Sequence, residues 1–90
     1  MNQVILNKKA QKQLRKTPAY IQANFQKWVR DVERLGIEEI RKIPGYHDEP
    51  VSWYRSTRLS RSYRAYYVEQ NGEIIIEVIG VNNHEYKKIR

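Results

Sequence analysis

The chain has 90 residues, which suffice for one domain, and we expect residues 1–90 to fold as a single unit with a thin core. It contains no cysteine, which excludes disulfides and thiolate metal sites and fits a reducing cytoplasm. The formal net charge of +7 favours an anionic partner, either a nucleic acid or an acidic protein. The apolar run at residues 4–6 is too short for a signal peptide or a membrane span.

The first half of the chain has the periodicity of helices. Residues 4–6 predict a short strand, and the polar, basic residues 8–16 predict a short surface helix. Thr17 and Pro18 predict the cap and the first residue of a second helix, which Gly36 ends. Residues 37–43 form a connector with room for one helical turn. The second helix has an apolar residue every three or four positions, which predicts a buried stripe of Ile21, Phe25, Trp28, Val32 and Leu35.

The second half alternates with period two. It predicts antiparallel strands over 56–59, 63–68 and 73–81, with a polar loop at 46–50 and a hairpin turn at Asn71-Gly72. Gly80 predicts a bend. In the last strand, alternation predicts two apolar faces, one of Ile74, Ile76 and Val78 and the other of Ile75, Ile79 and Val81. The elements together predict an α+β fold, with helices on one face of the sheet and the other face left for a ligand.

Residues 51–68 combine arginines with aromatic side chains and contain no acidic residue. Arginines recur at every third position from Arg55 through Arg58 and Arg61 to Arg64, and Trp53 and Tyr54 precede them. A guanidinium group binds phosphate through two parallel hydrogen bonds, and aromatic rings stack on bases. This stretch therefore predicts RNA binding, and the plainer interpretation is a solvated basic surface.

Arg64 lies in the middle of a predicted strand, among apolar and aromatic neighbours. A buried guanidinium is costly unless it pairs with an acid or serves a site. Glu77, on the neighbouring predicted strand, is the alternative structural partner. We therefore consider both a functional and a structural role for Arg64.

A set of four residues supplies the groups that RNA cleavage through the 2′-hydroxyl requires. The reaction needs a base for the 2′-hydroxyl proton, a cation for the phosphorane and an acid for the departing 5′-oxygen. The candidate catalytic residues are Glu49, Arg64, His84 and Tyr86. The predicted reaction uses no cofactor and no metal, and the adjacent residues 47–49 have poor geometry for metal ligation.

Four segments resemble motifs of the RelE/ParE superfamily, the toxins of bacterial toxin–antitoxin modules. Residues 62–67 resemble the arginine-bearing strand of that superfamily. Glu49-Pro50-Val51 resembles the Glu-Pro-Leu loop of YoeB-like members, and residues 52–56 resemble the aromatic and basic stretch that follows it. His84-Glu85-Tyr86 resembles the C-terminal His/Tyr signature of the ribonuclease members.

The resemblance implies a RelE-like fold, in which an N-terminal helical hairpin packs on one face of a small, twisted antiparallel sheet. It implies a metal-independent endoribonuclease that cleaves mRNA in the ribosomal A site and assembles with a cognate antitoxin in the cytoplasm. In that reaction, Glu49 would be the general base, Arg64 the transition-state cation and His84 the general acid, while Tyr86 would orient or stack on the substrate. Two alternatives are a ParE-like inhibitor that binds DNA gyrase and an inactive member that binds antitoxin and operator DNA.

Overall fold

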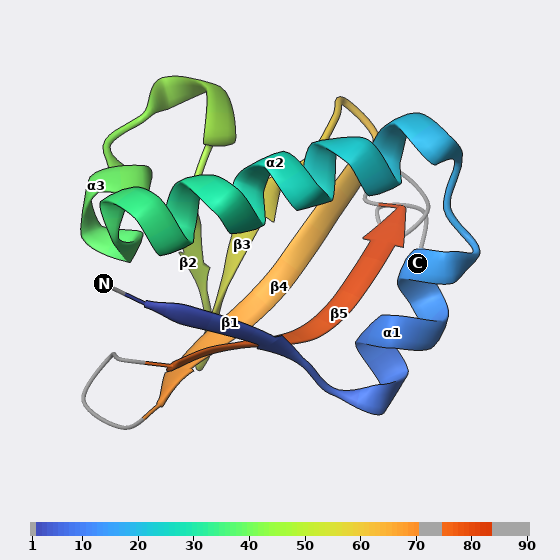
Figure 1. The fold of residues 1–90 in the computed structure, drawn as a ribbon, viewed down its shortest axis with the longest axis horizontal. Helices are drawn as coiled ribbons and strands as arrows, with labels where there is room; N and C mark the ends of the chain where they lie inside the picture. The colour runs from blue at the N-terminus through green and yellow to red at the C-terminus, as the bar shows by residue number, and fades with distance from the viewer. Residues whose placement is uncertain (1, 71–74, 84–90) are drawn as a thin grey trace.

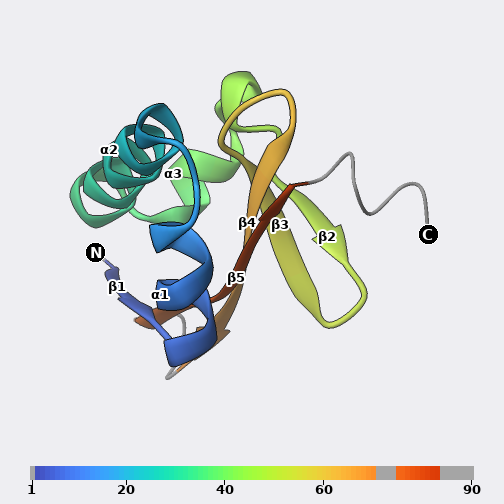
Figure 2. The same ribbon diagram turned by 90° about the vertical axis from the view of Figure 1, so that its right-hand side faces the viewer.

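The computed structural model describes residues 2–70 and 75–83, which form five strands, three α-helices and one 3₁₀ turn. The strands make one sheet in the order β1-β5-β4-β3-β2, and α2 and α3 lie on one side of it (Figures 1 and 2). This arrangement confirms the predicted α+β fold. The elements are β1 (Gln3–Leu6), α1 (Lys8–Arg15), α2 (Ala19–Leu35), α3 (Ile37–Arg41), η1 (Pro44–Tyr46), β2 (Glu49–Val51), β3 (Tyr54–Arg58), β4 (Tyr63–Gln70) and β5 (Ile75–Asn83).

The helix boundaries follow from capping residues. The side chain of Asn7 accepts a hydrogen bond from the Ala10 amide, 2.8 Å away, and so caps α1. Thr17 was predicted to cap α2, but Pro18 occupies that position, and the Thr17 hydroxyl instead donates to the Leu14 carbonyl at the end of α1, at 2.7 Å. Gly36 ends α2 as predicted, with a φ of 90° that favours glycine. Among the described helices, none combines the length and the apolar character that a membrane crossing requires.

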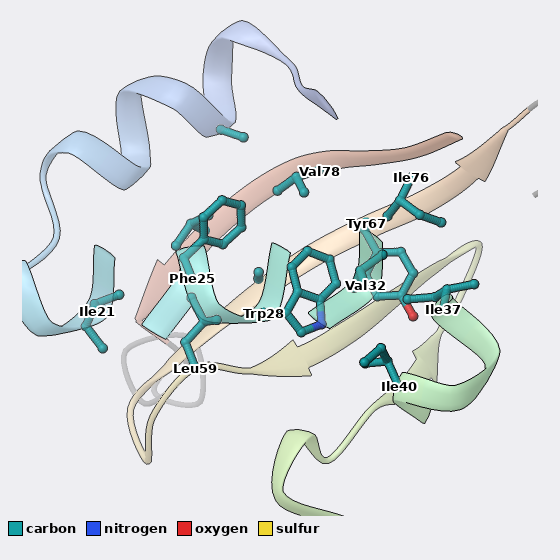
Figure 3. Close-up of a cluster of buried hydrophobic side chains, with 13 residues drawn as sticks. Ile21, Phe25, Trp28, Val32, Ile37, Ile40, Leu59, Tyr67, Ile76 and Val78 are labelled. Atoms are coloured by element: carbon teal, nitrogen blue, oxygen red, sulfur yellow. The ribbon is translucent and has the colours of Figure 1, made fainter. Parts of the chain in front are cut away.

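The apolar stripe of α2 forms one wall of the core, and strands β4 and β5 form the other (Figure 3). The ring centroids of Trp28 and Tyr67 lie 5.6 Å apart across these layers. Burial of each large apolar side chain stabilises the fold by about 2–3 kcal/mol. Leu35 was predicted to join the stripe, but it is 40% exposed because it is the last residue of α2. The fully buried members of the stripe are Ile21, Phe25, Trp28 and Val32.

The sheet is mixed rather than wholly antiparallel. Strands β3, β4 and β5 pair antiparallel in sequence, as predicted, and β2 pairs antiparallel to β3, whereas β1 pairs parallel to β5. Val4 lies opposite Ile76 and Leu6 lies opposite Val78, and both β1 side chains pack against the core. A parallel pair needs a long crossover connection, and here the helices and the other strands supply it.

A β-bulge changes the predicted faces of the last strand. The pairing of β4 with β5 shifts register between Tyr66 and Tyr67, so Ile79 is left without a partner in β4. Val81 therefore faces the core, at 2% exposed, instead of lying on the same face as Ile79. The bulge adjoins Gly80, where a bend was predicted. Ile74 and the predicted hairpin turn at 71–72 lie outside the described residues.

The predicted polar loop at 46–50 is partly wrong, because Glu49–Val51 forms the edge strand β2. An edge strand tolerates Pro50, which lacks an amide proton. The β2–β3 connection is a two-residue turn at Ser52 and Trp53, and Ser52 has a φ of 57°, a left-handed conformation that costs a residue with a Cβ atom.

Replacing Ser52 with glycine should therefore raise the free energy of unfolding by about 0.5–1 kcal/mol, since glycine adopts this conformation without steric cost. Ser52→Ala is the matched control, because it keeps the Cβ atom and should bring no gain. Urea denaturation of the three proteins measures the difference. Equal stability of the glycine variant and the natural protein would contradict strain at this turn.

Candidate active site

The candidate active site lies on the face of the sheet opposite α2 and α3. We call this face of the sheet the helix-free face (Figure 2). Ser56 pairs with both Glu49 and Tyr66 across neighbouring strands, so these three side chains lie on one face, and Arg64 and Tyr54 join them by alternation. The alternate positions of β4, Ala65 and Tyr67, lie in the core. The helix-free face thus includes Glu49, Tyr54, Ser56, Arg64 and Tyr66.

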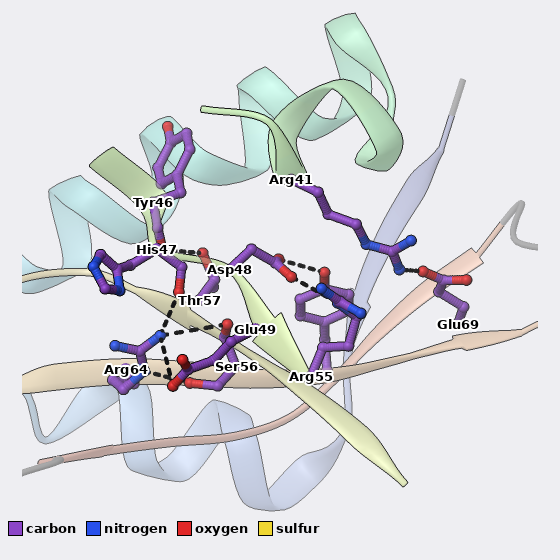
Figure 4. A network of polar contacts seen from close by, with 11 residues as sticks. Arg41, Tyr46, His47, Asp48, Glu49, Arg55, Ser56, Thr57, Arg64 and Glu69 are labelled. Atoms are coloured by element: carbon purple, nitrogen blue, oxygen red, sulfur yellow. Dashed lines mark hydrogen bonds and ion pairs between the residues drawn. The ribbon is translucent and has the colours of Figure 1, made fainter. Parts of the chain in front are cut away.

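Arg64 is held in a fixed position on this face and is only 7% exposed (Figure 4). Its Nε atom donates a hydrogen bond to Ser56 Oγ, and Nη2 donates to the His47 carbonyl at 2.7 Å. His47 adopts a left-handed conformation with a φ of 48°. Glu49 Oε2 lies 3.9 Å from Nη2. Among the described residues, no acceptor binds Nη1, so the guanidinium keeps donors for a ligand.

The alternative prediction, that Glu77 is the structural partner of Arg64, is wrong. Glu77 lies opposite Val68 in the β4–β5 ladder and accepts a hydrogen bond from the Gln70 side chain. Arg64 instead contacts Glu49, whose side chain is 54% exposed. Because the only carboxylate near Arg64 among the described residues is partly solvated, the guanidinium charge is incompletely compensated.

Two adjacent carboxylates point to opposite faces of the sheet. Glu49 lies on the helix-free face, whereas Asp48 is completely buried on the other side. Asp48 accepts hydrogen bonds from Arg55 Nε at 2.6 Å and from the Tyr67 hydroxyl at 2.5 Å. Burial of Tyr67 and its hydrogen bond to Asp48 raise the pKa of the Tyr67 hydroxyl. Asp48 therefore has structural partners, while Glu49 remains accessible to a substrate.

The structure separates the arginines predicted to bind RNA. Arg55 lies opposite Tyr67, on the helix side of the sheet, and its charge is matched by Asp48. Burial disfavours the charged form of Arg55, but the hydrogen bond and the negative charge of Asp48 outweigh this effect, so the pKa of Arg55 is raised. Arg58 lies directly opposite Arg64, and Arg61 is exposed in the β3–β4 turn. Arg58 and Arg61 are thus near Arg64, whereas Arg55 belongs to the Asp48 pair.

Aromatic rings form a row along the helix-free face. The Trp53 and Tyr54 rings make an edge contact with centroids 5.1 Å apart, and Tyr54 makes a second edge contact with Tyr66 at 5.7 Å. Trp53 is 72% exposed, which makes its ring available for stacking. Burial raises the pKa of the Tyr66 hydroxyl, although the Arg64 charge opposes that rise. Tyr54 and Tyr66 thus place two aromatic rings on the same face as Arg64.

Two predicted catalytic residues, His84 and Tyr86, lie outside the described residues. Strand β5 ends at Asn83, and Asn82 lies opposite Arg64 while Asn83 lies opposite Tyr63. The end of β5 thus lies beside Arg64.

Sequence reasoning missed two groups that hold Arg64. The Ser56 hydroxyl and the His47 carbonyl both accept hydrogen bonds from its guanidinium. Alternation along β3 gives a signal for Ser56, a small polar residue on the same face as Tyr54, but no pattern reveals the carbonyl. Among the described residues, no three His, Cys, Asp or Glu side chains gather where they could hold a metal ion.

The family model described as the ParE toxin of type II toxin–antitoxin systems, parDE, matches residues 4–87 of this sequence. The chain belongs to the ParE toxin family. It is therefore a toxin of a type II toxin–antitoxin system. No curated protein matches this ParE-family chain by sequence.

Solved structures of related toxins share the fold of this ParE-family member. The archaeal RelE–RelB complex from Pyrococcus horikoshii matches with a TM-score of 0.69 at 18% identity, covering 92% of this chain and 94% of that one. The YoeB/ParE toxin from Agrobacterium tumefaciens matches with a TM-score of 0.68 at 18% identity, covering 93% and 99% of the two chains. The intact E. coli RelBE toxin–antitoxin complex matches with a TM-score of 0.66 at 21% identity, covering 92% and 96%. The fold is RelE-like.

Proposed function

We propose that this toxin is an endoribonuclease that cleaves mRNA by attack of a 2′-hydroxyl on the neighbouring phosphate. The observation that carries the proposal is the pairing of an accessible carboxylate, Glu49, with the rigidly held Arg64 at 3.9 Å on the helix-free face. A base beside a fixed cation is what this reaction requires, because a proton leaves the 2′-hydroxyl as negative charge builds on the phosphorane.

Each step has a candidate group. Glu49 accepts the 2′-hydroxyl proton, the 2′-oxygen bonds to phosphorus, and Arg64 stabilises the extra charge. His84, two residues after Asn82 in the sequence, protonates the departing 5′-oxygen, and Tyr86 orients or stacks on the substrate. The products are a 2′,3′-cyclic phosphate and a 5′-hydroxyl. Because proton transfers and guanidinium donors complete this scheme, it calls for no cofactor.

A single RNA strand fits the rest of the helix-free face. Trp53 and Tyr54 offer rings on which unpaired bases stack, and Arg58 and Arg61 offer donors to the flanking phosphates. The Arg58–Arg64 juxtaposition supports this assignment, because like charges placed directly opposite each other destabilise a sheet unless an anion lies between them.

The partners follow from the family and the charge. We propose that a cognate antitoxin binds this chain in a hetero-oligomer, as in the solved RelE–RelB and RelBE complexes. An acidic segment of that antitoxin would complement the net charge of +7. Messages engaged in the ribosomal A site, in the cytoplasm, are the proposed substrate.

A synthetic RNA with a single 2′-deoxy nucleotide at the cleavage site should resist the toxin, because the attacking oxygen is missing. Glu49→Gln should lower the rate of cleaving the natural RNA about 10²–10⁴-fold, since the amide cannot accept the proton. Electrophoresis of end-labelled RNA, with identification of the cyclic phosphate, measures both effects. Equal cleavage of the deoxy and natural RNAs would rule out the proposed chemistry.

The family match supports a second candidate, a ParE-like toxin that inhibits DNA gyrase by binding and cuts no RNA. A supercoiling assay with purified gyrase, run beside primer extension on messages from induced cells, separates the two. Inhibited supercoiling with intact messages and an SOS response would favour gyrase. Discrete cuts within codons favour the ribonuclease.

A further inference from the structure

The exposed side of α1 carries five cations, which we call the α1 cation surface: Lys8, Lys9, Lys12, Arg15 and Lys16. All five side chains are exposed, and helical spacing places them on the side opposite Ala10 and Leu14, which pack toward the core. No acidic residue occurs between residues 7 and 17. The surface is therefore a concentrated positive charge on one side of a short helix.

Among the described residues, none of these cations forms an ion pair, whereas most cations on α2 and α3 do. Lys27 and Arg34 both pair with Asp31, Arg41 pairs with Glu69 and Lys42 pairs with Glu39. Like charges spaced four residues apart destabilise a helix. The uncompensated repulsion along α1 is relieved when an anion binds there.

Helix α1, which carries this surface, lies beside the end of β5 and so near the candidate active site. Gln13 Oε1 accepts a hydrogen bond from the Val81 amide at 2.8 Å, which fixes α1 beside the end of β5 (Figure 1). The next residue of β5, Asn82, lies opposite Arg64. A polyanion on α1 would therefore lie next to the RNA strand proposed for the helix-free face.

The composition of this surface favours a nucleic-acid duplex over a protein or a single strand. Protein interfaces need apolar or aromatic anchors, yet the large exposed hydrophobic residues in the part of the chain that the structure describes all lie outside α1: Ile5, Tyr20, Leu35 and Trp53. Single strands bind through stacked bases, and α1 has no aromatic residue. A duplex presents its phosphates and hides its bases, so cations alone suffice. An eight-residue helix spans about 12 Å, along which a duplex carries about seven charges.

We propose that α1 docks on the phosphate backbone of double-stranded RNA adjoining the single strand that enters the candidate active site. The choice of RNA rests on the proposed ribonuclease function. The two surfaces divide the recognition: aromatic rings and Arg64 bind the unpaired segment, while the lysines of α1 hold the paired region beside it. The second contact is independent of sequence because only phosphates are bound.

The test measures binding of a labelled RNA duplex by fluorescence anisotropy over about 50 to 200 mM salt. It compares the natural toxin with the triple variant Lys8→Gln/Lys12→Gln/Lys16→Gln. Each phosphate contact contributes about 0.9 to the slope of log affinity against log salt. The triple variant should therefore lower the slope by about two to three and weaken binding more than tenfold at about 0.1 M salt. Glutamine preserves the helix because its helix propensity is close to that of lysine.

Arg30→Gln/Arg34→Gln/Lys42→Gln is the matched control, because it removes the same net charge from α2 and the end of α3. It should change the slope by less than one. The proposal would be overturned if the two triple variants lost duplex affinity equally. It would also be overturned if the α1 triple variant kept its duplex affinity and lost antitoxin binding. The single variant Lys12→Gln, with an expected slope change of about one, tests it if the triple variant does not fold.

Cleavage of a short single strand, measured on the same proteins, separates this inference from the proposed function. The α1 triple variant should cleave it at the natural rate, because the helix-free face is intact. If the natural toxin binds the duplex but cleaves no RNA, the proposed ribonuclease function is contradicted and the role of α1 in duplex binding is not. Natural cleavage with unchanged duplex binding by the triple variant would contradict the role of α1 alone.

Discussion

Arg64→Ala should lower the rate of RNA cleavage about 10²–10³-fold, equivalent to about 3–4 kcal/mol of transition-state stabilisation. The guanidinium is held by Ser56 and the His47 carbonyl, so in the proposed reaction its remaining donors would meet the phosphorane without further ordering. Arg64→Lys should recover only a small part of the rate, because an ammonium group keeps the charge but cannot reproduce the planar fork. Single-turnover cleavage of a synthetic RNA measures both variants.

The Arg64 experiment needs evidence that the fold survives. Arg64→Ala should still bind the antitoxin and unfold cooperatively, since the side chain lies on the helix-free face and outside the apolar core. Arg30→Ala, which removes an exposed cation from α2, is the matched control for charge and should cleave at the natural rate. Cleavage by Arg64→Ala within threefold of the natural rate would show that Arg64 does not contact the reacting phosphate.

Asp48→Asn should destabilise the fold by about 2–3 kcal/mol, lowering Tm by roughly 10–20 °C. The carboxylate is fully buried and accepts hydrogen bonds from Arg55 and the Tyr67 hydroxyl. An isosteric amide leaves the Arg55 charge without its counterion and gives Tyr67 a weaker acceptor. Calorimetry and urea denaturation measure the change.

The neighbouring carboxylate supplies the control for Asp48. Glu49→Gln should change stability by less than about 0.5 kcal/mol, because its side chain is half-exposed and its ion pair with Arg64 is long. The two variants should therefore differ in what they change: Asp48→Asn should lower the stability of the fold, and Glu49→Gln should lower the rate of RNA cleavage. A stable Asp48→Asn protein would contradict the structural assignment of that carboxylate.

Local patterns predicted those parts of the fold that depend on neighbouring residues. The helical spacing of Ile21, Phe25, Trp28 and Val32 identified the buried stripe, and alternation identified the strands from residue 56 onward. The parallel pairing of β1 with β5 escaped prediction because it joins residues more than seventy positions apart. Gly80 predicted a bend in β5, but the change of faces after Ile79 escaped prediction, since the extra residue of a bulge inverts every later side chain and leaves no mark on hydrophobicity.

The candidate site was predictable in its residue types but not in its geometry. An arginine among aromatic residues identified Arg64, and adjacency to Pro50 indicated an extended backbone at Glu49. The even spacing of arginines suggested one surface, yet a strand turns alternate residues to opposite faces, so Arg55 and Arg58 separate. The Asp48 contact to Arg55 depends on tertiary packing and has no signature in the sequence.

The pairing of β1 with β5 has a consequence for synthesis on the ribosome. The first strand of the chain cannot enter the sheet until residues 75–78 have emerged from the exit tunnel. Until then, the apolar side of α2 has no β5 to pack against, and the nascent chain lacks a complete core. Such long-range closure slows folding relative to a helical bundle of similar size. A cell that makes this toxin therefore has an interval in which the growing polypeptide is open to chaperones and proteases and has not yet reached its folded state.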